Sequence, residues 1–337
     1  KEFKKNDFIK KKIKFSYKKQ DLADSNIYII CVPTPIKKNY LPDLSHIKKS
    51  ISIISKYIKV GDVIILESTV YPGVTEKFTN FLEIKSGLKN NKDFYICYSP
   101  ERINPGDNSK NLKNINKIFA VNSNNKKIIS RIKKVYKLIS KELIFTKNIH
   151  EAETAKAIEN TQRDLNIALF NEILILSKKI NLNFNEVIKL ASTKWNFIKF
   201  QPGLVGGHCL PVDPYYLSYI AKKNKFRTNT LLSGRSTNNN MKDYVISLIL
   251  KCIKKHKLNN KSKILILGIS YKYGVSDLRN SMGLKIFNKI NKKYVNARFY
   301  DPFVNIKNNY RNINKIKNFK LIVFLSSGEK YKQIFKE

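Results

Sequence analysis

Three short apolar runs, each followed by polar residues, place the strongest constraint on the fold of the first part of this chain. The runs are IYIICV at residues 27–32, VIIL at 63–66 and FYICY at 94–98, and the segments that follow them are PTP, EST and SPE. Unbroken apolar runs of this length are typical of parallel strands that helices cover on both faces. The carboxyl ends of such strands line a ligand crevice, so we expect one site to gather Thr34, Ser68, Thr69 and Glu101.

The remainder of the 337-residue chain divides into a helical part and a second α/β part. Residues 151–179 contain neither Pro nor Gly and carry apolar residues at helical spacing, which predicts one helix of about 29 residues and about 43 Å. A further helical stretch is expected over residues 217–256, broken near 226–230. Apolar runs at 263–269, 297–302 and 321–325, with a helix at 283–292, predict a small Rossmann-like unit that holds a nucleotide.

The formal net charge of +40 at pH 7 comes from 65 Lys and Arg against 25 Asp and Glu. The lysines are spread along the whole chain with many Asn and Ile, which share A/T-rich codons, and no nucleic-acid-binding motif accompanies them. We therefore interpret the charge as a compositional bias and do not expect nucleic acid to be a partner. A field this positive does favour anionic ligands such as nucleotide diphosphates.

The four cysteines, Cys31, Cys97, Cys209 and Cys252, lie far apart and form no CxxC pair. The sequence therefore predicts neither a disulfide framework nor a zinc site, as is usual in the reducing cytoplasm. No apolar run approaches the roughly 20 residues of a membrane-spanning helix, and the charged first residues are not followed by the apolar segment of a signal peptide. We expect a cytoplasmic protein with no metal and no membrane insertion.

The segment GGHCLPVD at residues 206–213 sets a thiol in a glycine-rich bend, with a carboxylate four residues on. Gly206 and Gly207 permit positive φ and let a ligand come close to the sulfur, while Pro211 fixes φ on the exit. Asp213 can reach the volume beside the Cys209 thiol and orient a water or a neighbouring Lys there. These polar neighbours indicate a reactive cysteine rather than a buried structural one.

Two polar residues of the long predicted helix extend this candidate site. Lys156 and Asn160 are four residues apart, so they share one face of the helix and both can reach one ligand atom. A Lys–Asn pair alone is usually a solvated helix face. Together with Thr69, Cys209 and Asp213, it indicates a catalytic group.

These residues resemble those of the UDP-glucose/GDP-mannose dehydrogenase family, and most of all its UDP-N-acetylhexosamine 6-dehydrogenase branch. The resemblance covers nearly all of the chain. It rests on VPTP at 32–35, ESTVYPG at 67–73, SPERINPG at 99–106, ENTQRDLNIAL at 159–169, KWNF at 194–197, residues 202–217 and DLRNS at 277–281. Within these segments, INPG, QRD and VDPYY favour the N-acetylhexosamine branch over the glucose branch.

The resemblance implies an α/β fold of three domains. It implies a Rossmann-like NAD-binding domain at 1–148, a central long-helix domain at 149–258 that carries the cysteine loop and forms a homodimer, and a Rossmann-like UDP-sugar domain at 259–337. The implied activity is the four-electron oxidation of a UDP-N-acetylhexosamine at C6 to the uronic acid, with two NAD⁺ consumed per sugar. Such products serve surface polysaccharides such as capsule and O-antigen.

The chemistry of the family gives the candidate residues their expected roles. Cys209 adds to the sugar aldehyde as a thiohemiacetal and is then acylated as a thioester. Lys156 and Asn160 stabilise the developing oxyanion, and Asp213 and Thr69 orient the water that releases the acid.

The same resemblance assigns binding residues. Those expected to face NAD are Thr34, Ser68, Thr69 and Arg279. Those expected to contact the substrate are Glu101, Arg102, Asn104, Lys156, Asn160, Arg163, Lys194, Gly206, Arg235 and Lys272. Glu101 is also expected to assist catalysis.

The largest departure from the family is a missing GxGxxG turn, which seats the pyrophosphate of a dinucleotide on backbone N–H groups. No GxGxxG occurs in the chain. Residues 13–16 read as the third strand of a Rossmann domain whose first βαβ unit, about 30 residues long, is missing. We therefore expect the chain to be an N-terminally shortened fragment.

Three alternatives stay open from the sequence. The first is a UDP-glucose or GDP-mannose 6-dehydrogenase, and the second is a catalytically silent fragment that only binds a nucleotide sugar. The third is a basic nucleic-acid-binding protein, which would show salt-dependent retention on DNA. The choice between GlcNAc and GalNAc is also open, because pocket geometry rather than a motif reads the orientation of one hydroxyl.

Overall fold

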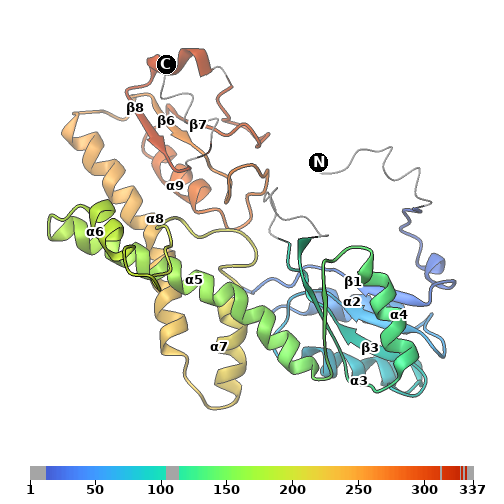
Figure 1. Ribbon diagram of the computed structural model, residues 1–337. Helices are drawn as coiled ribbons and strands as arrows, with labels where there is room; N and C mark the ends of the chain where they lie inside the picture. The colour runs from blue at the N-terminus through green and yellow to red at the C-terminus, as the bar shows by residue number, and fades with distance from the viewer. Residues whose placement is uncertain (1–12, 104–113, 312, 327, 329–330, 332–337) are drawn as a thin grey trace.

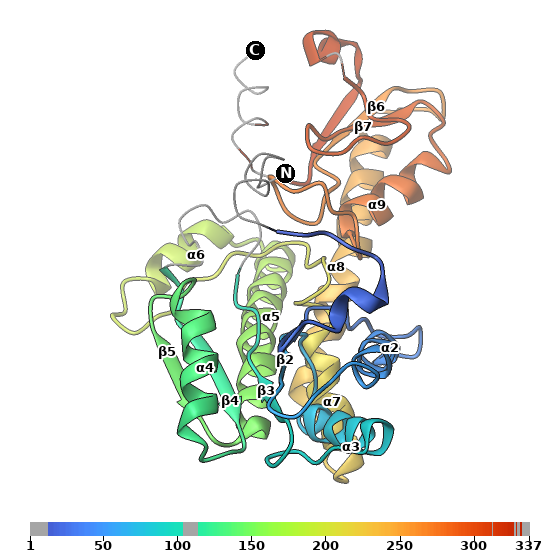
Figure 2. The same ribbon diagram turned by 90° about the vertical axis from the view of Figure 1, so that its right-hand side faces the viewer.

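The computed structural model describes residues 13–103, 114–311, 313–326, 328 and 331. Two sheets lie at opposite ends of the molecule, and the long helices of the central part run between them (Figures 1 and 2). The carboxyl ends of strands in both sheets lead into the loops that build the site described below.

The first sheet has five strands in the order β1-β2-β3-β4-β5. Their bounds are β1 (Ile27–Ile30), β2 (Val63–Leu66), β3 (Tyr95–Tyr98), β4 (Lys117–Val121) and β5 (Leu143–Thr146). All neighbours are parallel except β3 and β4. The helices of this part are α2 (Ser45–Ile54), α3 (Val74–Ser86) and α4 (Lys126–Lys137), and a short 3₁₀ helix, η1 (Lys19–Leu22), precedes β1.

Strand β2 explains why the sheet needs helices on both faces. All four of its residues are buried. Ile64 and Leu66 join the core under α2 and α3, whereas Val63 and Ile65 join the core under α4. This confirms the strands expected from the three apolar runs, with a doubly covered sheet as predicted.

The prediction of a strand at residues 13–16 is wrong. In the described part of the chain these residues belong to no strand, and Ile13, Phe15 and Tyr17 are 48%, 74% and 94% exposed. Alternating apolar residues favour a strand only where a neighbouring strand supplies hydrogen bonds and a buried face, and the described residues supply neither here. The antiparallel pairing of β3 and β4 is a second feature that the sequence analysis did not predict.

The central part consists of four helices. They are α5 (Ile149–Lys179), α6 (Phe184–Ala191), α7 (Asp213–Lys223) and α8 (Asn229–Lys255). The long helix predicted at 151–179 is confirmed, and the break between α7 and α8 falls close to the expected residues 226–230. The side chain of Asn148 accepts from the backbone N–H groups of His150 and Glu151 and so caps the start of α5.

The second sheet has the order β7-β6-β8 and is parallel throughout. Its strands are β6 (Ile264–Leu267), β7 (Ala297–Tyr300) and β8 (Leu321–Phe324), with α9 (Met282–Asn291) and a 3₁₀ helix, η3 (Ile313–Asn318). The start of α9 lies against the end of β6, where a Cβ on Gly283 would come within 3.0 Å of the Gly268 carbonyl oxygen. The predicted Rossmann-like unit is confirmed in its strands and its helix.

Candidate active site

The cysteine loop is fastened to the second α/β domain. Gly207 has φ +90°, and a Cβ at this position would come within 2.8 Å of the Tyr271 ring, so only glycine fits. The Gly207 N–H donates to the Arg279 carbonyl at 3.1 Å, and the Asn280 side chain donates to the Gly207 carbonyl at 3.0 Å. The loop therefore lies where the central and second α/β domains meet.

The start of α7 fixes the spacing between the thiol and the carboxylate. The Cys209 carbonyl accepts from the N–H groups of Val212 and Asp213 at 2.9 and 3.0 Å. A proline occupies the first turn of α7, where its missing N–H leaves no bond unmade. This turn brings the side chain of Asp213, 2% exposed, into the same part of the molecule as the half-buried Cys209.

Helix α5 supplies the other side of the site. Asn160 Nδ2 donates to Asp213 Oδ2 at 2.6 Å, and Lys156, one turn earlier, is 8% exposed. Burial raises the pKa of the Asp213 carboxyl to about 7, although the hydrogen bond from Asn160 and the charge of Lys156 both lower it. A carboxyl that titrates near pH 7 is suited to act as a general base.

The Cys209 thiol is not an activated thiolate in this state. Burial and, after it, the charge of Asp213 raise its pKa to about 11, while Lys156 and Arg279 act in the opposite direction. The four side chains therefore share one electrostatic environment, in which the proton of the thiol depends on the charge of its neighbours.

The ends of β1 and β2 contact helix α7, which carries Asp213 of the site. Tyr216 of α7 donates its hydroxyl to the Thr34 carbonyl, and the Thr34 hydroxyl donates to the Thr69 carbonyl at 2.7 Å. Ser68 is buried and donates to the Val32 carbonyl at 2.7 Å. Ser68 thus holds the two strand ends together, whereas the next residue, Thr69, is only partly buried.

The loop after β3 is docked on α5 by an ion pair. Arg102 lies 2.9 Å from Glu159, the residue before Asn160, so its guanidinium is occupied by a carboxylate of the protein. The Glu101 carboxylate accepts from the backbone N–H groups of Arg102 and Ile103. The predicted substrate residue Asn104 lies outside the described residues.

A small cavity opens beside Gly206 at the carboxyl end of the second sheet. Its lining includes Gly268, Ser270, Lys272 and Ser326. Lys272 was expected to contact the substrate, and it lies where a nucleotide meets the strand ends of a Rossmann-like unit.

Arg279 lies on the edge of the site nearest the solvent. Its guanidinium pairs with Asp277 at 2.6 Å, and its side chain is 57% exposed. Because its charge lowers the pKa of Cys209, it lies within electrostatic reach of the thiol.

The remaining predicted substrate residues are not brought to the cysteine loop. Arg163 and Lys194 are exposed on α5 and after α6. Arg235 is 1% exposed and pairs with the fully buried Asp164. In this state Arg235 therefore joins α8 to α5, and its guanidinium does not face an open pocket.

Sequence reasoning missed several residues that position the site. Glu153, fully buried on α5, accepts from the N–H groups of Gly73 and Thr75 at 2.6 and 2.9 Å, and so caps α3. Glu159 and Tyr216 were also missed. Glu159 and Tyr216 lie inside the motifs that resemble the family, whereas Glu153 lies in none of them. Contacts between residues so far apart in the sequence leave no local pattern.

The domains of one known family match this chain in order. The NAD binding domain of the UDP-glucose/GDP-mannose dehydrogenase family matches residues 2–140, its central domain 150–240 and its UDP binding domain 265–337. The chain belongs to this family. It is an NAD-dependent UDP-sugar dehydrogenase, and the expected recognition, fold class and cofactor are thereby confirmed.

Individual relatives agree with this assignment. A UDP-N-acetyl-D-glucosamine 6-dehydrogenase of Pseudomonas aeruginosa is 40% identical over 295 residues, which are 87% of this chain and 69% of the relative. The enzyme of the same name from Salmonella typhi is 41% identical over the same shares. Among solved structures, a UDP-D-ManNAc dehydrogenase from Pyrococcus horikoshii has a TM-score of 0.84 at 33% identity, covering 95% of this chain and 77% of that one.

The residues at the ends of β1 and β2 fit the cofactor of the family. The hydroxyl groups of Thr34 and Thr69 at these strand ends are of the kind that binds an anionic dinucleotide, whereas the exposed Arg279 lies before α9, beside the cysteine loop. Within the described residues, no group of three His, Cys, Asp or Glu is placed to hold a metal ion. The same residues include no helix with the length and apolar character to cross a membrane.

Proposed function

We propose that the substrate of this UDP-sugar dehydrogenase is a UDP-N-acetylhexosamine with the gluco or galacto configuration, oxidised at C6 to the uronic acid. The two relatives at 40 and 41% identity, both named for UDP-N-acetyl-D-glucosamine, support this choice. A relative at 39% identity is named CapL, and we propose surface polysaccharide as the destination of the product. The observation that carries the proposal is the grouping of Cys209, Asp213, Asn160 and Lys156.

The first oxidation converts the C6 alcohol to an aldehyde. NAD⁺, when bound, supplies the acceptor for the hydride that leaves C6 in each oxidation. Lys156, buried beside Asp213, stabilises the oxygen as it loses its proton and carries negative charge. Asn160 adds a neutral amide donor on the same helix face.

In the second stage Cys209 becomes covalently attached to the sugar. The sulfur adds to the aldehyde carbon as the thiol proton passes to a base, which returns it to the former carbonyl oxygen, and the thiohemiacetal forms. Because the pKa of the free thiol is raised to about 11, a base must take that proton as the C–S bond forms. Asp213, with a pKa of about 7, is the base we assign. Loss of a second hydride from C6, together with the hydroxyl proton to solvent, turns the thiohemiacetal into a thioester.

Hydrolysis then returns the thiol. Asp213 and Thr69 orient a water, whose oxygen attacks the thioester carbon as its proton passes to Asp213. The C–S bond breaks as the sulfur takes this proton back from Asp213, and the acid is released as a carboxylate after losing its own proton to solvent. The sum is four electrons lost from C6 and two hydrides transferred for each sugar.

We further propose that the protein is a homodimer formed along α5 and α6. Leu169 and Leu176 are exposed one heptad apart on α5, Leu190 is exposed on α6, and Trp195 just after it is 91% exposed. Large apolar side chains gathered in this way are typical of a protein–protein interface.

The decisive experiment measures NADH formed per sugar for UDP-GlcNAc, UDP-GalNAc, UDP-ManNAc, UDP-glucose and GDP-mannose. It uses this chain and the same chain preceded by a βαβ unit with a GxGxxG turn. From the chain that carries the added βαβ unit, we expect two NADH and one uronate per UDP-GlcNAc or UDP-GalNAc. Turnover of only UDP-ManNAc or UDP-glucose would overturn the proposed substrate. A yield of one NADH with a released aldehyde would overturn the thioester mechanism.

A further inference from the structure

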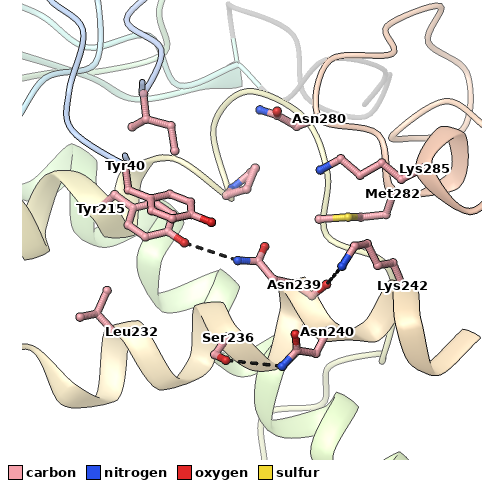
Figure 3. A pocket seen from close by; sticks show the side chains of 12 residues that line it. Tyr40, Tyr215, Leu232, Ser236, Asn239, Asn240, Lys242, Asn280, Met282 and Lys285 are labelled. Carbon is pink, nitrogen blue, oxygen red and sulfur yellow. Dashed lines mark hydrogen bonds between the residues drawn. The ribbon is translucent and has the colours of Figure 1, made fainter. Parts of the chain in front are cut away.

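A second cavity, of about 640 Å³, lies apart from the cysteine site. Its walls come from the loop between β1 and α2, from α7 and α8, and from the start of α9 (Figure 3). All three domains therefore contribute to it. Among the described residues, neither Cys209 nor Asp213 lines it. Its volume lies within the range of about 300–1,000 Å³ that is usual for sites of small organic ligands.

One end of this cavity is aromatic. The rings of Tyr40 and Tyr215 stack with centroids 4.5 Å apart and planes at 19°. Asn239 donates its side-chain amide to the Tyr215 hydroxyl at 3.4 Å and so orients that ring. A flat pair of phenol rings at the edge of a polar cavity offers a surface against which another aromatic ring can stack.

The backbone at Tyr40 is held in an unfavourable conformation. Its φ is +61°, a region that bulky residues rarely adopt. The turn is closed by bonds from the Tyr40 N–H to the Lys37 carbonyl and from the Lys37 N–H to the Leu41 carbonyl. Strain of this kind persists where the surroundings enforce it and concentrates at ligand sites. Here it presents the ring of Tyr40 to Tyr215.

The other end of the cavity is cationic. Lys242 of α8 and Lys285 of α9 lie across from the tyrosines, and Lys285 points into the open space (Figure 3). Lys242 pairs with Asp243 outside the cavity, whereas no acidic side chain is among the described residues that line it. Burial lowers the pKa of Lys285, and the positive charges of Lys242 and Arg235 lower it as well, although each of these two cations pairs with a carboxylate of the protein.

Amide and hydroxyl groups lie between the two ends. Ser236, Asn239 and Asn240 line the floor along α8, and Asn280 lines the wall at the cysteine loop. Asn280 also holds the Gly207 carbonyl, and Pro211 of the same loop lines the cavity. A ligand here would touch the backbone that carries Cys209 without entering the site of reaction.

We propose that this cavity is a second binding site for a nucleoside phosphate, with the base against Tyr40 and Tyr215 and the phosphate between Lys242 and Lys285. The aromatic end and the cationic end together match a ligand that has both a flat ring and a negative charge. Stacking is indifferent to which base is present, so the site takes purine and pyrimidine nucleotides alike. By joining loops of three domains, the ligand holds the cysteine loop in place.

The test is calorimetric titration of this chain with AMP, UMP and inorganic phosphate. Each titration is made with and without saturating UDP-GlcNAc, which fills the proposed substrate site. We expect one molecule of AMP or UMP to bind per chain while UDP-GlcNAc is present. This readout needs no turnover, so a failed NADH assay and a failed nucleotide titration are separate results.

Three variants decide where the nucleotide binds. Lys285→Gln should weaken AMP binding at least tenfold, while Lys289→Gln, at an exposed position one turn further along the same helix and outside the cavity lining, should leave it unchanged. Tyr40→Asn removes the ring at a position where Asn tolerates positive φ, so the variant should fold and bind AMP at least fivefold more weakly. It should bind phosphate as before.

Three results would overturn the proposal. One is the absence of AMP and UMP binding in the presence of UDP-GlcNAc. Another is binding that neither Lys285→Gln nor Tyr40→Asn weakens. The third is phosphate binding as tight as AMP binding, which would mean a simple anion site with no role for the tyrosines.

Discussion

Asn160 donates a 2.6 Å hydrogen bond to Asp213 across 53 residues of sequence. The bond joins the long helix α5 to the first turn of α7, and α7 begins four residues after Cys209. The position of the carboxylate relative to the thiol is therefore set by two helices rather than by a flexible loop. Two rigid elements can hold reacting groups in a fixed arrangement more closely than loops can.

The raised pKa of Asp213 predicts a pH-dependent gain in stability when its charge is removed. Its folded pKa, about 7, lies above the ordinary value of 3.8, so folding must bury a charge once the pH passes 7. Asp213→Asn removes that charge and keeps an acceptor for Asn160. Its gain in unfolding free energy should be absent near pH 4, grow up to pH 7 and then stay constant, at most about 4 kcal/mol.

Urea unfolding at pH 4, 6 and 8 measures this effect. Asp243→Asn is the matched control, because the side chain of Asp243 is 63% exposed in its ion pair with Lys242 and should change stability by less than about 1 kcal/mol. A gain from Asp213→Asn that is equal at all three pH values would contradict the raised pKa. The variant should also lose uronate formation, since the assigned base is absent.

Replacing the cysteine should separate the two oxidations. Cys209→Ala removes the atom that holds the aldehyde as a thiohemiacetal, so the first hydride transfer should persist in part while acid formation stops. We expect at most one NADH per sugar, detected together with aldehyde trapped by a hydrazine. Unchanged uronate yield from this variant would refute the thioester role.

The conformation of Gly207 predicts a large effect from a single methyl group. Gly207→Ala places a Cβ within 2.8 Å of the Tyr271 ring at φ +90°, so the cysteine loop or the ring must move. We expect a loss of turnover of at least 100-fold, since small displacements of a reacting group are costly. Gly203→Ala is the control, because a Cβ there meets nothing within 4 Å. Equal turnover of the two variants would show that the loop tolerates displacement.

The apolar surface of α5 predicts a dimer that one charge disrupts. Leu176 is half-exposed on α5, and Leu176→Glu would bury a carboxylate in the proposed interface. Sedimentation should give a dimer for the parent chain and a monomer for this variant. The control is Lys178→Glu, an exposed position two residues away. A monomeric parent chain at micromolar concentration would rule the dimer out.

Local sequence patterns predicted most of the fold because burial on two faces leaves a continuous apolar run. The four buried residues of β2 and of β6 are of this kind. The strand prediction at residues 13–16 was wrong, because Ile13 and Phe15 alternate with polar residues rather than form such a run, and alternation alone cannot supply a partner strand. The sequence patterns also did not predict that β4 pairs antiparallel with β3. The direction of a strand depends on the path of the chain that connects it to its neighbour and not on the residues of the strand.

The candidate site shows a similar division. Cys209 and Asp213 are near in sequence, and Lys156 and Asn160 share a helix face, so each pair was accessible to spacing rules. What joins the pairs is tertiary packing, seen in the hydrogen bond from Asn160 to Asp213, and only the structure contains it. The family resemblance gave Arg235 an expected contact with the substrate, because a sequence does not reveal that Asp164 lies buried beside it.

The ion pair of Arg235 and Asp164 yields the last prediction. Both side chains are almost completely buried, and Asp164 also accepts from Asn238. Arg235→Met leaves the Asp164 charge without its cation and should cost about 3–5 kcal/mol of unfolding free energy. The double variant Arg235→Met with Asp164→Asn removes both charges and should recover most of that loss.

The double variant also decides whether Arg235 touches the substrate. If the guanidinium only joins α8 to α5, a double variant that folds should bind UDP with a dissociation constant within about twofold of the parent. Lys272→Gln, at the cavity beside Gly206, serves as the comparison and should weaken UDP binding at least tenfold. If the stable double variant also binds UDP at least tenfold more weakly, Arg235 belongs to the substrate site. In the parent chain its guanidinium would then have to leave Asp164 when the nucleotide binds.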